Sequence, residues 1–302
     1  MTLLNDPASV PSAMWAVARL LASSSRPLPV EEARSLLSPA SLLGEGKAEK
    51  DQTFAWAVRT LEDLGLVQVE SDHVGLTGPA GDLSVDDVVR FADLLRSAVL
   101  APERNVGIGQ GSEQTGPRDL VRGLAWFLCG DPLAAPLGLQ EVEQQQQGAF
   151  PERVGKLPIA NDFRWNRFLY WAPALGFAAT AVLHTDSRAQ KLICDCTAAV
   201  KRTVLRRWPK DQRIDAPVAV AGILEDLPVL PGGRYSRELE LPVPAHTVSA
   251  SLSFALLRGN DQGWISLQRD ADAPREVLVI DTDTAAGTRR VTHMTVLGDF
   301  DA

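Results

Sequence analysis

Cysteine is scarce in this sequence, and long apolar runs are missing. The 302 residues include three cysteines, an odd number that forms no disulfide framework, and two of them are the close pair Cys194 and Cys196. The longest weakly charged run, residues 171–183, is too short to cross a bilayer. The first residues, MTLLNDPASV, lack the basic and apolar segments of a signal peptide. We therefore expect a cytoplasmic protein that does not span or bind a membrane.

The motifs of common enzyme sites are also missing. No GxxxxGK[ST] phosphate-binding loop occurs, and the glycines of GIGQG at 107–111 follow no expected strand, so we predict a flexible surface loop there. The acidic pair Asp281 and Asp283 could touch a cation, but a single D-x-D is too common to indicate a site. No spacing ties a Ser, a His and an Asp together. The sequence favours a protein that is not an enzyme and that holds no cofactor.

The four histidines are spread along the chain and form no metal-binding pair. The nearest approach to a metal cluster is Cys194 and Cys196 with His184. We predict a helix through the two cysteines, and residues two apart on a helix point about 200° away from each other. The thiols would then not share a metal, and Cys196 is expected to be a small core residue. We predict no metal site.

The first 77 residues have the pattern of a small domain. Residues 12–24 carry a helical apolar stripe behind Ser12 as the expected N-cap, PVEEARSLL predicts a second helix, and QTFAWAVRTLEDLG predicts a third that ends at a left-handed Gly65. After Gly65 the apolar period becomes alternating, and Ser71-Asp72 between two short runs predicts a hairpin. Three helices followed by a two-stranded hairpin resemble winged helix-turn-helix domains.

The middle of the chain is predicted to be helical. SVDDVVRFADLLRSAVL and DLVRGLAWFLC are expected helices, and the tract EQQQQG at 143–148 is expected to be exposed. The inner set of the first of these helices is predicted to be Val85, Val88, Val89, Leu95 and Val99. The expected domains are residues 1–80, 81–148 and 149–302.

The second half is predicted to be helical first and stranded at its end. NDFRWNRFLYWAPALGFA is expected to be an aromatic-rich helix whose Trp165 and Trp171 serve the core, RAQKLICDCTAAVKRTVLRRW a longer helix, and DAPVAVAGILEDL a short one. The helix TVSASLSFALLRG then leads into the strands WISLQRD, REVLVID and RRVTHMTVL. This order suggests a second winged-helix unit with an enlarged wing. The predicted fold is mainly α with small β-hairpins, as tandem winged-helix domains joined by a helical region.

The charge of the first domain does not favour DNA binding. The net charge of the chain is −8, and residues 1–77 hold six basic and ten acidic groups, a net of −4. The third helix would offer Gln52, Trp56 and Arg59 to a DNA groove. Its wing, residues 70–73, carries two acidic groups where many DNA-binding wings have Arg or Lys. A winged helix used for protein contact or dimerisation is the equal alternative.

The positive charge gathers instead in residues 188–213, with eight basic and two acidic groups, a net of +6. A positive ridge at helical spacing would include Lys201, Arg202, Arg206 and Lys210, beside Arg207. The alternative is that these arginines pair with acidic residues of the first half or cap a helix C-terminus. A second basic and aromatic cluster lies at residues 164–167.

Three segments together resemble the DpdG-type proteins: MTLLNDPASVPSAMWAVARLLAS, residues 61–77, and DFRWNRFLYWAPALGFA at 162–178. Those proteins are accessory components of a multi-gene bacterial system that modifies DNA with deazaguanine and restricts unmodified DNA. The resemblance implies a role in defence against phage or foreign DNA, beside helicase- and nuclease-like partners. It carries no catalytic residues to this chain, and the acidic wing departs from what a direct DNA reader should show.

We therefore predict a non-enzymatic accessory protein that binds or targets double-stranded DNA within a bacterial defence complex. The protein could form a homodimer. Two alternatives stay open: a winged-helix scaffold or adaptor for protein partners, and a transcriptional regulator. The expected DNA contacts are Gln52, Trp56, Arg59, Lys201, Arg202, Arg206 and Arg207.

Overall fold

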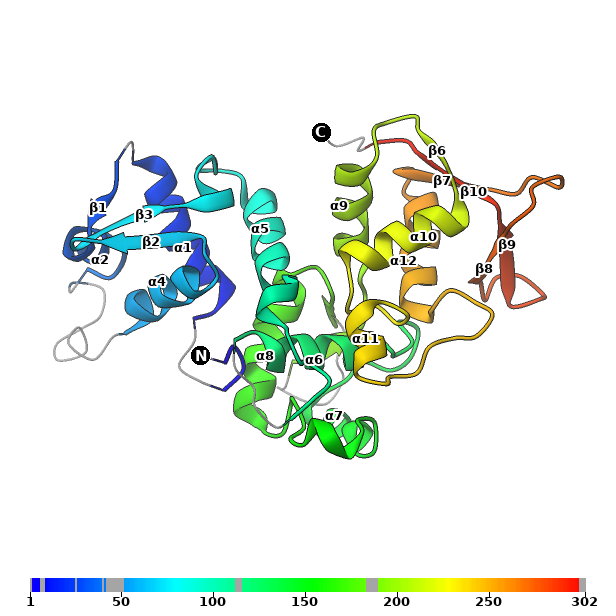
Figure 1. Cartoon of the computed structure of the whole chain (residues 1–302), viewed down its shortest axis with the longest axis horizontal. Helices are drawn as coiled ribbons and strands as arrows, with labels where there is room; N and C mark the ends of the chain where they lie inside the picture. The colour runs from blue at the N-terminus through cyan, green and yellow to red at the C-terminus, as the bar shows by residue number, and fades with distance from the viewer. Residues whose placement is uncertain are drawn as a thin grey trace. The chain divides into compact units, whose positions relative to one another are not determined.

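The computed structural model describes residues 2–5, 9–24, 26–39, 41, 52–111, 116–182 and 190–298. The chain is mixed α/β, about 46% helical with small antiparallel sheets, and not mainly α as expected (Figure 1). It packs as two compact units: Met1–Asn105 with Gln114–Asp119 form unit 1, and Val106–Glu113 with Leu120–Ala302 form unit 2. The domain boundary expected at residue 148 falls inside unit 2. Within the described ranges, every helix is too short or too polar to pass through a membrane.

Unit 1 begins with three helices that pack through their apolar stripes. They are α1 (Pro11–Ser23), α2 (Val30–Leu37) and α4 (Thr53–Asp63). The predicted inner face of α4 is confirmed, because Phe54, Ala57, Val58, Leu61 and Leu64 are all buried. The predicted N-cap of α1, Ser12, is wrong by two residues. Proline fits the first helical position, where no amide hydrogen is needed, so the helix begins at Pro11 with Val10 as its N-cap.

A three-stranded sheet closes this helical layer. Its strands are β1 (Leu28–Pro29), β2 (Val67–Glu70) and β3 (His73–Leu76), paired antiparallel in the order β1-β3-β2. Gly65 ends α4 with φ of 71°, so the chain turns directly into β2. The predicted hairpin is confirmed, and its turn places Ser71 and Asp72 at φ of 47° and 64°. Both residues therefore adopt left-handed backbone conformations.

The rest of unit 1 contains the 3-10 turns η2 (Gly78–Ala80) and η3 (Pro102–Arg104) and the helix α5 (Val88–Leu100). The predicted inner set of α5 is wrong in part: Val88 and Val89 are each 50% exposed, and Phe91 and Leu94 are buried instead. The helix starts later than the expected segment: its N-cap is Asp87, which accepts a hydrogen bond from the Arg90 amide, so Val85 precedes the helix and Val88 is its first residue.

A buried carboxylate fixes the start of the chain in unit 1. Asp119 is fully buried and accepts hydrogen bonds from the backbone amides of Leu3 at 3.1 Å and Leu4 at 2.7 Å. Both leucine side chains are buried as well. The N-terminal residues thus belong to the core of unit 1.

The helical part of unit 2 consists of α6 (Arg118–Phe127), which starts in unit 1, α7 (Leu139–Gln146), the 3-10 turn η4 (Glu152–Val154) and α8 (Asp162–Ala174). The predicted aromatic helix is confirmed as α8, and Trp165 and Trp171 lie in the core as expected. The glutamine tract is exposed only in part. Gln146 is fully buried, and its side-chain amide forms hydrogen bonds with both the backbone carbonyl and the backbone N–H of Ile159.

The long helix predicted from residue 188 is wrong in its first half. Leu192–Ile193 form strand β5, which pairs with β4 (Ala179–Thr180), and the helix, α9, extends only over Thr197–Arg207. Leu192 also exchanges two backbone hydrogen bonds with Leu137, which hold it in an extended conformation. Residues 183–189, including His184 and Arg188, lie outside the described residues.

The end of unit 2 follows the element order described for unit 1, with an additional helix and an additional hairpin. After α9 come β6 (Arg213–Asp215), α10 (Ala216–Asp226), α11 (Arg234–Glu238), α12 (Ala250–Asp261) and β7 (Ile265–Gln268). The hairpin of β8 (Val277–Ile280) and β9 (Thr288–Val291) follows, and β10 (His293–Val296) returns to the sheet. The antiparallel order β6-β10-β7 matches β1-β3-β2, because in both sheets the last strand lies in the middle. The segment RRVTHMTVL, predicted as one strand, is divided between β9 and β10.

Helix α12 lies close to the sheet of unit 2 because of a glycine. A Cβ atom on Gly259 would collide with the indole ring of Trp264, which is almost fully buried. Gly259 therefore allows Trp264 to pack directly against the backbone of α12.

Candidate nucleic-acid interface

Three of the predicted contact residues lie together on the exposed side of α4. Gln52 and Arg59 are exposed, and Trp56 is half-buried between them. The indole Nε1 of Trp56 donates to Oε1 of Gln52 at 3.1 Å, which orients both side chains along the helix. Arg59 has no ion-pair partner among the described residues, so its guanidinium faces solvent.

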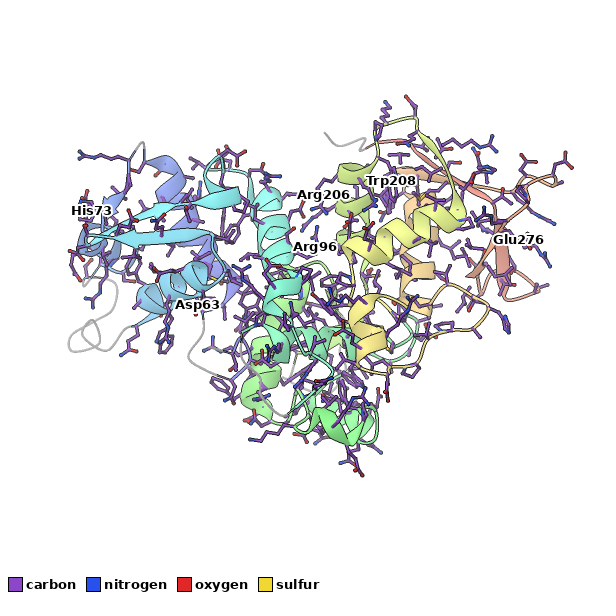
Figure 2. The ribbon with its side chains drawn as sticks, viewed as in Figure 1. Asp63, His73, Arg96, Arg206, Trp208 and Glu276 are labelled. Carbon is purple, nitrogen blue, oxygen red and sulfur yellow. The ribbon has the colours of Figure 1, made fainter. Side chains whose placement is uncertain are left out.

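Acidic groups follow Arg59 on the same helix and also occur in the hairpin. Glu62 and Asp63 are exposed at the C-terminal end of α4, three and four residues after Arg59. Glu70 and Asp72 are exposed in the β2–β3 hairpin, where Figure 2 labels His73. The ring Nδ1 of His73 lies 2.9 Å from the carbonyl oxygen of Ser71, within the turn itself. The tip of the hairpin thus carries negative charge and no arginine or lysine.

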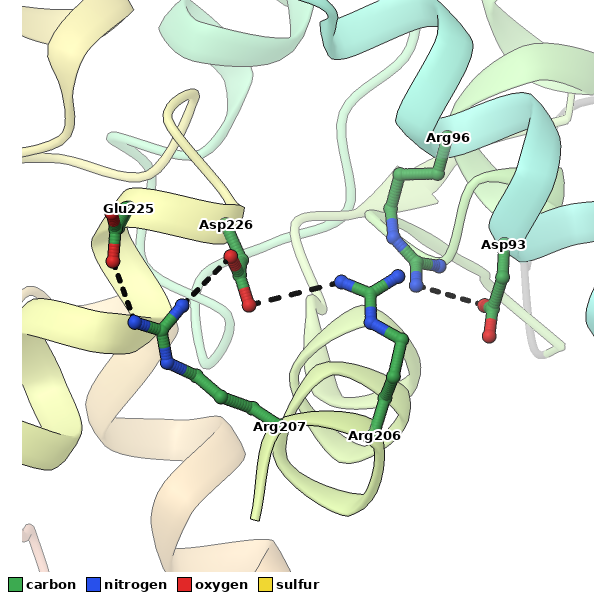
Figure 3. Close-up of polar contacts among 6 residues, drawn as sticks. All are labelled: Asp93, Arg96, Arg206, Arg207, Glu225 and Asp226. Atoms are coloured by element: carbon green, nitrogen blue, oxygen red, sulfur yellow. Dashed lines mark hydrogen bonds and ion pairs between the residues drawn. The ribbon is translucent and has the colours of Figure 1, made fainter. Parts of the chain in front are cut away.

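The two arginines that end α9 are neutralised, whereas Lys210 of the predicted basic ridge lies after the helix and is exposed. Arg207 bonds Glu225 at 2.6 Å and Asp226 at 2.9 Å, and Arg206 lies 3.7 Å from the second carboxylate oxygen of Asp226 (Figure 3). The bond with Glu225 is the main reason why the pKa of Arg207 is raised above its ordinary value. These acidic groups belong to α10 of the same unit, not to the first half of the chain as the alternative expected.

Close packing brings α9 and α10 together at this point. A Cβ atom on Gly222 would lie 2.8 Å from Nε of Arg207 and 3.0 Å from the Trp208 ring. The guanidinium of Arg207 also lies over the Trp208 ring, 5.6 Å from its centroid. The glycine therefore admits the arginine and tryptophan side chains against the helix that supplies the acidic partners.

The two sets of predicted DNA contacts do not form one cluster within a unit. Gln52, Trp56 and Arg59 belong to unit 1, and the four residues of α9 belong to unit 2. Lys201 and Arg202 are half-buried, and each has an interaction of its own within the protein. The sequence did not identify Glu225 and Asp226 as partners. The signal that could have identified these partners is the acidic pair near the end of DAPVAVAGILEDL, in the helix that follows the basic run.

Two other segments, the D-x-D at residues 281–283 and GIGQG at 107–111, have structural roles. Asp281 is buried and pairs with Nε of Arg289 at 2.8 Å, so one of its carboxylate oxygens is already bound to a cation of the protein. The GIGQG segment, predicted to be a flexible surface loop, is held by buried Arg122, which donates to three of its carbonyl oxygens at 2.8–3.2 Å. The segment lies at the surface as predicted, with Gly107, Gln110 and Gly111 exposed, but it is anchored by the fully buried Ile108 and by Arg122.

The three thiols are protonated structural groups. Burial raises the pKa of Cys129 to about 11 and that of Cys194 to about 12, and it raises the pKa of fully buried Cys196 further. Cys196 is a core residue as predicted, but neither Cys194 nor Cys196 lies within a helix, so the geometry predicted for the pair is wrong. In the part of the chain that the structure describes, no group of three or more His, Cys, Asp or Glu residues could hold a metal ion.

These features define a two-unit, mixed α/β protein in which Arg59, on a solvent-facing helix of unit 1, is exposed and unpaired among the described residues. The chain belongs to the DpdG-like family, whose model matches residues 1–273. The family suggests a role in a DNA-modification defence system. No curated protein and no solved structure matches the chain.

Proposed function

We propose that both three-stranded sheets belong to winged-helix domains. The support is that both proposed domains begin with a helix, a strand and further helices and end with strands, and that the last strand lies in the middle of each sheet. Compared with the described elements of unit 1, unit 2 has α11 and the β8–β9 hairpin in addition. In unit 1 the recognition helix would be α4 and the wing β2–β3. In unit 2 the corresponding elements are α12 and the strands β7 and β10, with the β8–β9 hairpin inserted as an enlargement of the wing.

We further propose that the protein is a non-enzymatic accessory component of a bacterial DNA-modification and restriction system, acting in the cytoplasm, that contacts double-stranded DNA through α4. The observation that carries this proposal is the exposed Arg59, unpaired among the described residues, beside Trp56 and Gln52. An arginine placed so can reach a phosphate or a guanine edge in the major groove. Helicase- or nuclease-like subunits are the proposed protein partners.

The second winged-helix domain is proposed to contact protein. Its helix α12 exposes one arginine, Arg258, whose guanidinium bonds Asp195 at 3.0 Å and lies over the Phe254 ring at 5.4 Å. The Arg258 guanidinium therefore already has two interactions within the protein. The helix offers DNA no free arginine comparable to Arg59.

A second candidate function is that of a scaffold or adaptor whose winged helices, including the first, bind other subunits or a second copy of the chain. The observations that favour it are the acidic hairpin tip and the neutralised end of α9, in a chain of net charge −8. Such a protein would co-purify with its partner and would bind duplex DNA poorly. Regulation of its own operon would instead appear as a sequence-specific footprint upstream of the gene.

The test is a fluorescence anisotropy titration of the full chain with labelled duplex DNA at low salt, about 50 mM. Arg59→Glu should weaken binding at least tenfold, because it removes a phosphate contact and adds repulsion. The matched control is Arg90→Glu, the same charge change at an exposed residue of α5 in the same unit. Equal losses in both variants, or no duplex binding by the wild type, would contradict DNA contact through α4 and favour the adaptor.

A further inference from the structure

Helix α8 carries the two exposed aromatic side chains of the described chain. Phe163 is 45% exposed and Tyr170 is 57% exposed, whereas every other described Phe, Tyr or Trp is buried or half-buried. The two residues are seven apart, so they lie on one face of the helix, about 10 Å apart along its axis. Asn166 and Arg167 lie between them on the same face. We call Phe163, Asn166, Arg167 and Tyr170 the α8 stripe.

The helix holds this stripe in a fixed orientation. Its opposite face is filled by Trp165, Phe168 and Trp171, all buried, and the Trp165 and Phe168 rings stack with centroids 5.8 Å apart. The start of the helix is capped by Asn161, whose side chain accepts a hydrogen bond from the Arg164 amide at 2.9 Å. The helix cannot turn the exposed rings inward, because Trp165, Phe168 and Trp171 already fill the interior positions.

The chemistry of the α8 stripe matches that of a base-stacking surface. The guanidinium of Arg167 lies over the Phe163 ring, 5.3 Å from its centroid, and has no ion-pair partner among the described residues. It can stack on a base or bind a phosphate beside the ring. The exposed Asn166 amide can donate to and accept from a base edge.

Arg167 supplies the positive charge of the α8 stripe. Of the other basic groups nearby in the sequence, Arg153 pairs with Glu240 at 2.7 Å, and Arg164 is buried and donates to the Pro158 carbonyl at 2.8 Å, so a phosphate at the stripe would be bound through Arg167. A duplex hides the faces of its bases inside the stack, whereas a single strand offers them to aromatic rings, in a sequence-tolerant way.

We propose that the α8 stripe is a binding platform for single-stranded nucleic acid. Successive bases stack on Phe163 and Tyr170, and Arg167 between them binds the backbone. This site lies in unit 2 and does not depend on the proposed duplex contact through α4. Exposed Phe, Tyr and Arg side chains are also common at protein interfaces, so a protein ligand is the competing outcome.

The experiment is an anisotropy titration of the full chain with fluorescein-labelled oligothymidylate of about 20 nucleotides at about 50 mM salt. We expect Phe163→Ala with Tyr170→Ala to weaken binding by about tenfold or more, since stacking is worth about 1–3 kcal/mol per base. Arg167→Glu should also weaken it. Phe163→Tyr with Tyr170→Phe, which keeps both rings, should bind as the wild type does.

Two controls separate this proposal from other effects. Val218→Ala removes an exposed apolar group from another helix of the same unit and should leave oligothymidylate binding unchanged. Arg59→Glu should reduce duplex binding without reducing oligothymidylate binding, so each proposal can fail alone. The proposal is overturned if the wild type does not bind oligothymidylate, or if the double alanine variant, with an unchanged melting temperature, binds it equally well. It is also overturned if the stripe variants lose only a protein partner.

Discussion

Gln146 is the buried member of a glutamine tract whose neighbours Gln144, Gln145 and Gln147 are exposed. Its amide donates to the carbonyl of Ile159 at 2.8 Å and accepts from the Ile159 amide at 3.3 Å. The side chain thus acts as a strand would, pairing both backbone groups of a buried residue that has no sheet neighbour of its own.

Replacing Gln146 by alanine should lower the free energy of unfolding by about 2–4 kcal/mol, because two buried backbone groups lose their partner. Gln144→Ala, on the exposed side of the same tract, should change it by less than about 0.5 kcal/mol. Urea unfolding followed by circular dichroism measures both. Similar stability of the two variants would show that water replaces the lost hydrogen bonds at Ile159.

Cys129 gives the protein a specific loss of stability at alkaline pH. Burial raises the pKa of its thiol from 9.0 to about 11 in the folded state. In the unfolded chain the thiol loses its proton first, near pH 9, so rising pH favours unfolding until the folded thiol also ionises. The stabilising effect is complete below about pH 9 and disappears as pH rises through about 11.

Cys129→Ser should therefore flatten the decrease in unfolding free energy between pH 9 and about 11 by up to about 2 kcal/mol, since the hydroxyl does not ionise there. Serine can keep the hydrogen bond that the thiol donates to the Ala125 carbonyl at 3.3 Å. Chemical unfolding at a series of pH values compares the two proteins. Parallel curves would mean that the Cys129 thiol ionises alike in the folded and unfolded states.

The β2–β3 hairpin of unit 1 turns through two residues that are poorly suited to their backbone conformation. Ser71 and Asp72 both have positive φ, and Asn-Gly is the pair that such two-residue turns prefer. Ser71→Asn with Asp72→Gly should raise the unfolding free energy by about 0.5–1 kcal/mol. Ser71→Val should lower it by about 1 kcal/mol or more, because a β-branched side chain clashes at that φ. Thermal and urea unfolding test both variants, and equal stabilities would exclude strain in this turn.

Strong local periodicity made some elements predictable. The stripe of α4, the cap at Gly65, the following hairpin and the aromatic core face of α8 all follow from apolar spacing and turn residues. These signals lie within a few residues of one another, so no distant contact is needed to interpret them. The residues of the α4 face could be named for the same reason.

Contacts between distant segments explain the failures. Leu192 is extended because it pairs with Leu137, and Arg207 is neutralised by Glu225 and Asp226 from the next helix. The helical pattern through Leu192 and the basic run at α9 are genuine local signals that tertiary contacts override. The burial of Gln146 likewise depends on its hydrogen bonds with Ile159. Composition alone predicts an exposed glutamine tract, because it contains no information about this distant contact.

The charge of the whole molecule determines how any DNA binding should respond to salt. The end of α9 has no local net charge, since Arg206 and Arg207 face Glu225 and Asp226. An approaching phosphate would be attracted by the arginines and repelled by the carboxylates at nearly the same distance. The unpaired Arg59 on α4 then contributes most, against the acidic hairpin tip.

Duplex affinity should therefore fall with salt along a shallow slope. If about one to three phosphates are neutralised, log K against log salt should have a slope between about −1 and −3. Arg59→Ala should make the slope less steep by about 1, whereas Arg206→Ala with Arg207→Ala should leave it unchanged. Anisotropy titrations over a series of salt concentrations measure these slopes. A slope near about −6, or one that flattens when Arg206 and Arg207 are removed, would place the phosphate contacts on α9 and would mean that its ion pairs open when DNA binds.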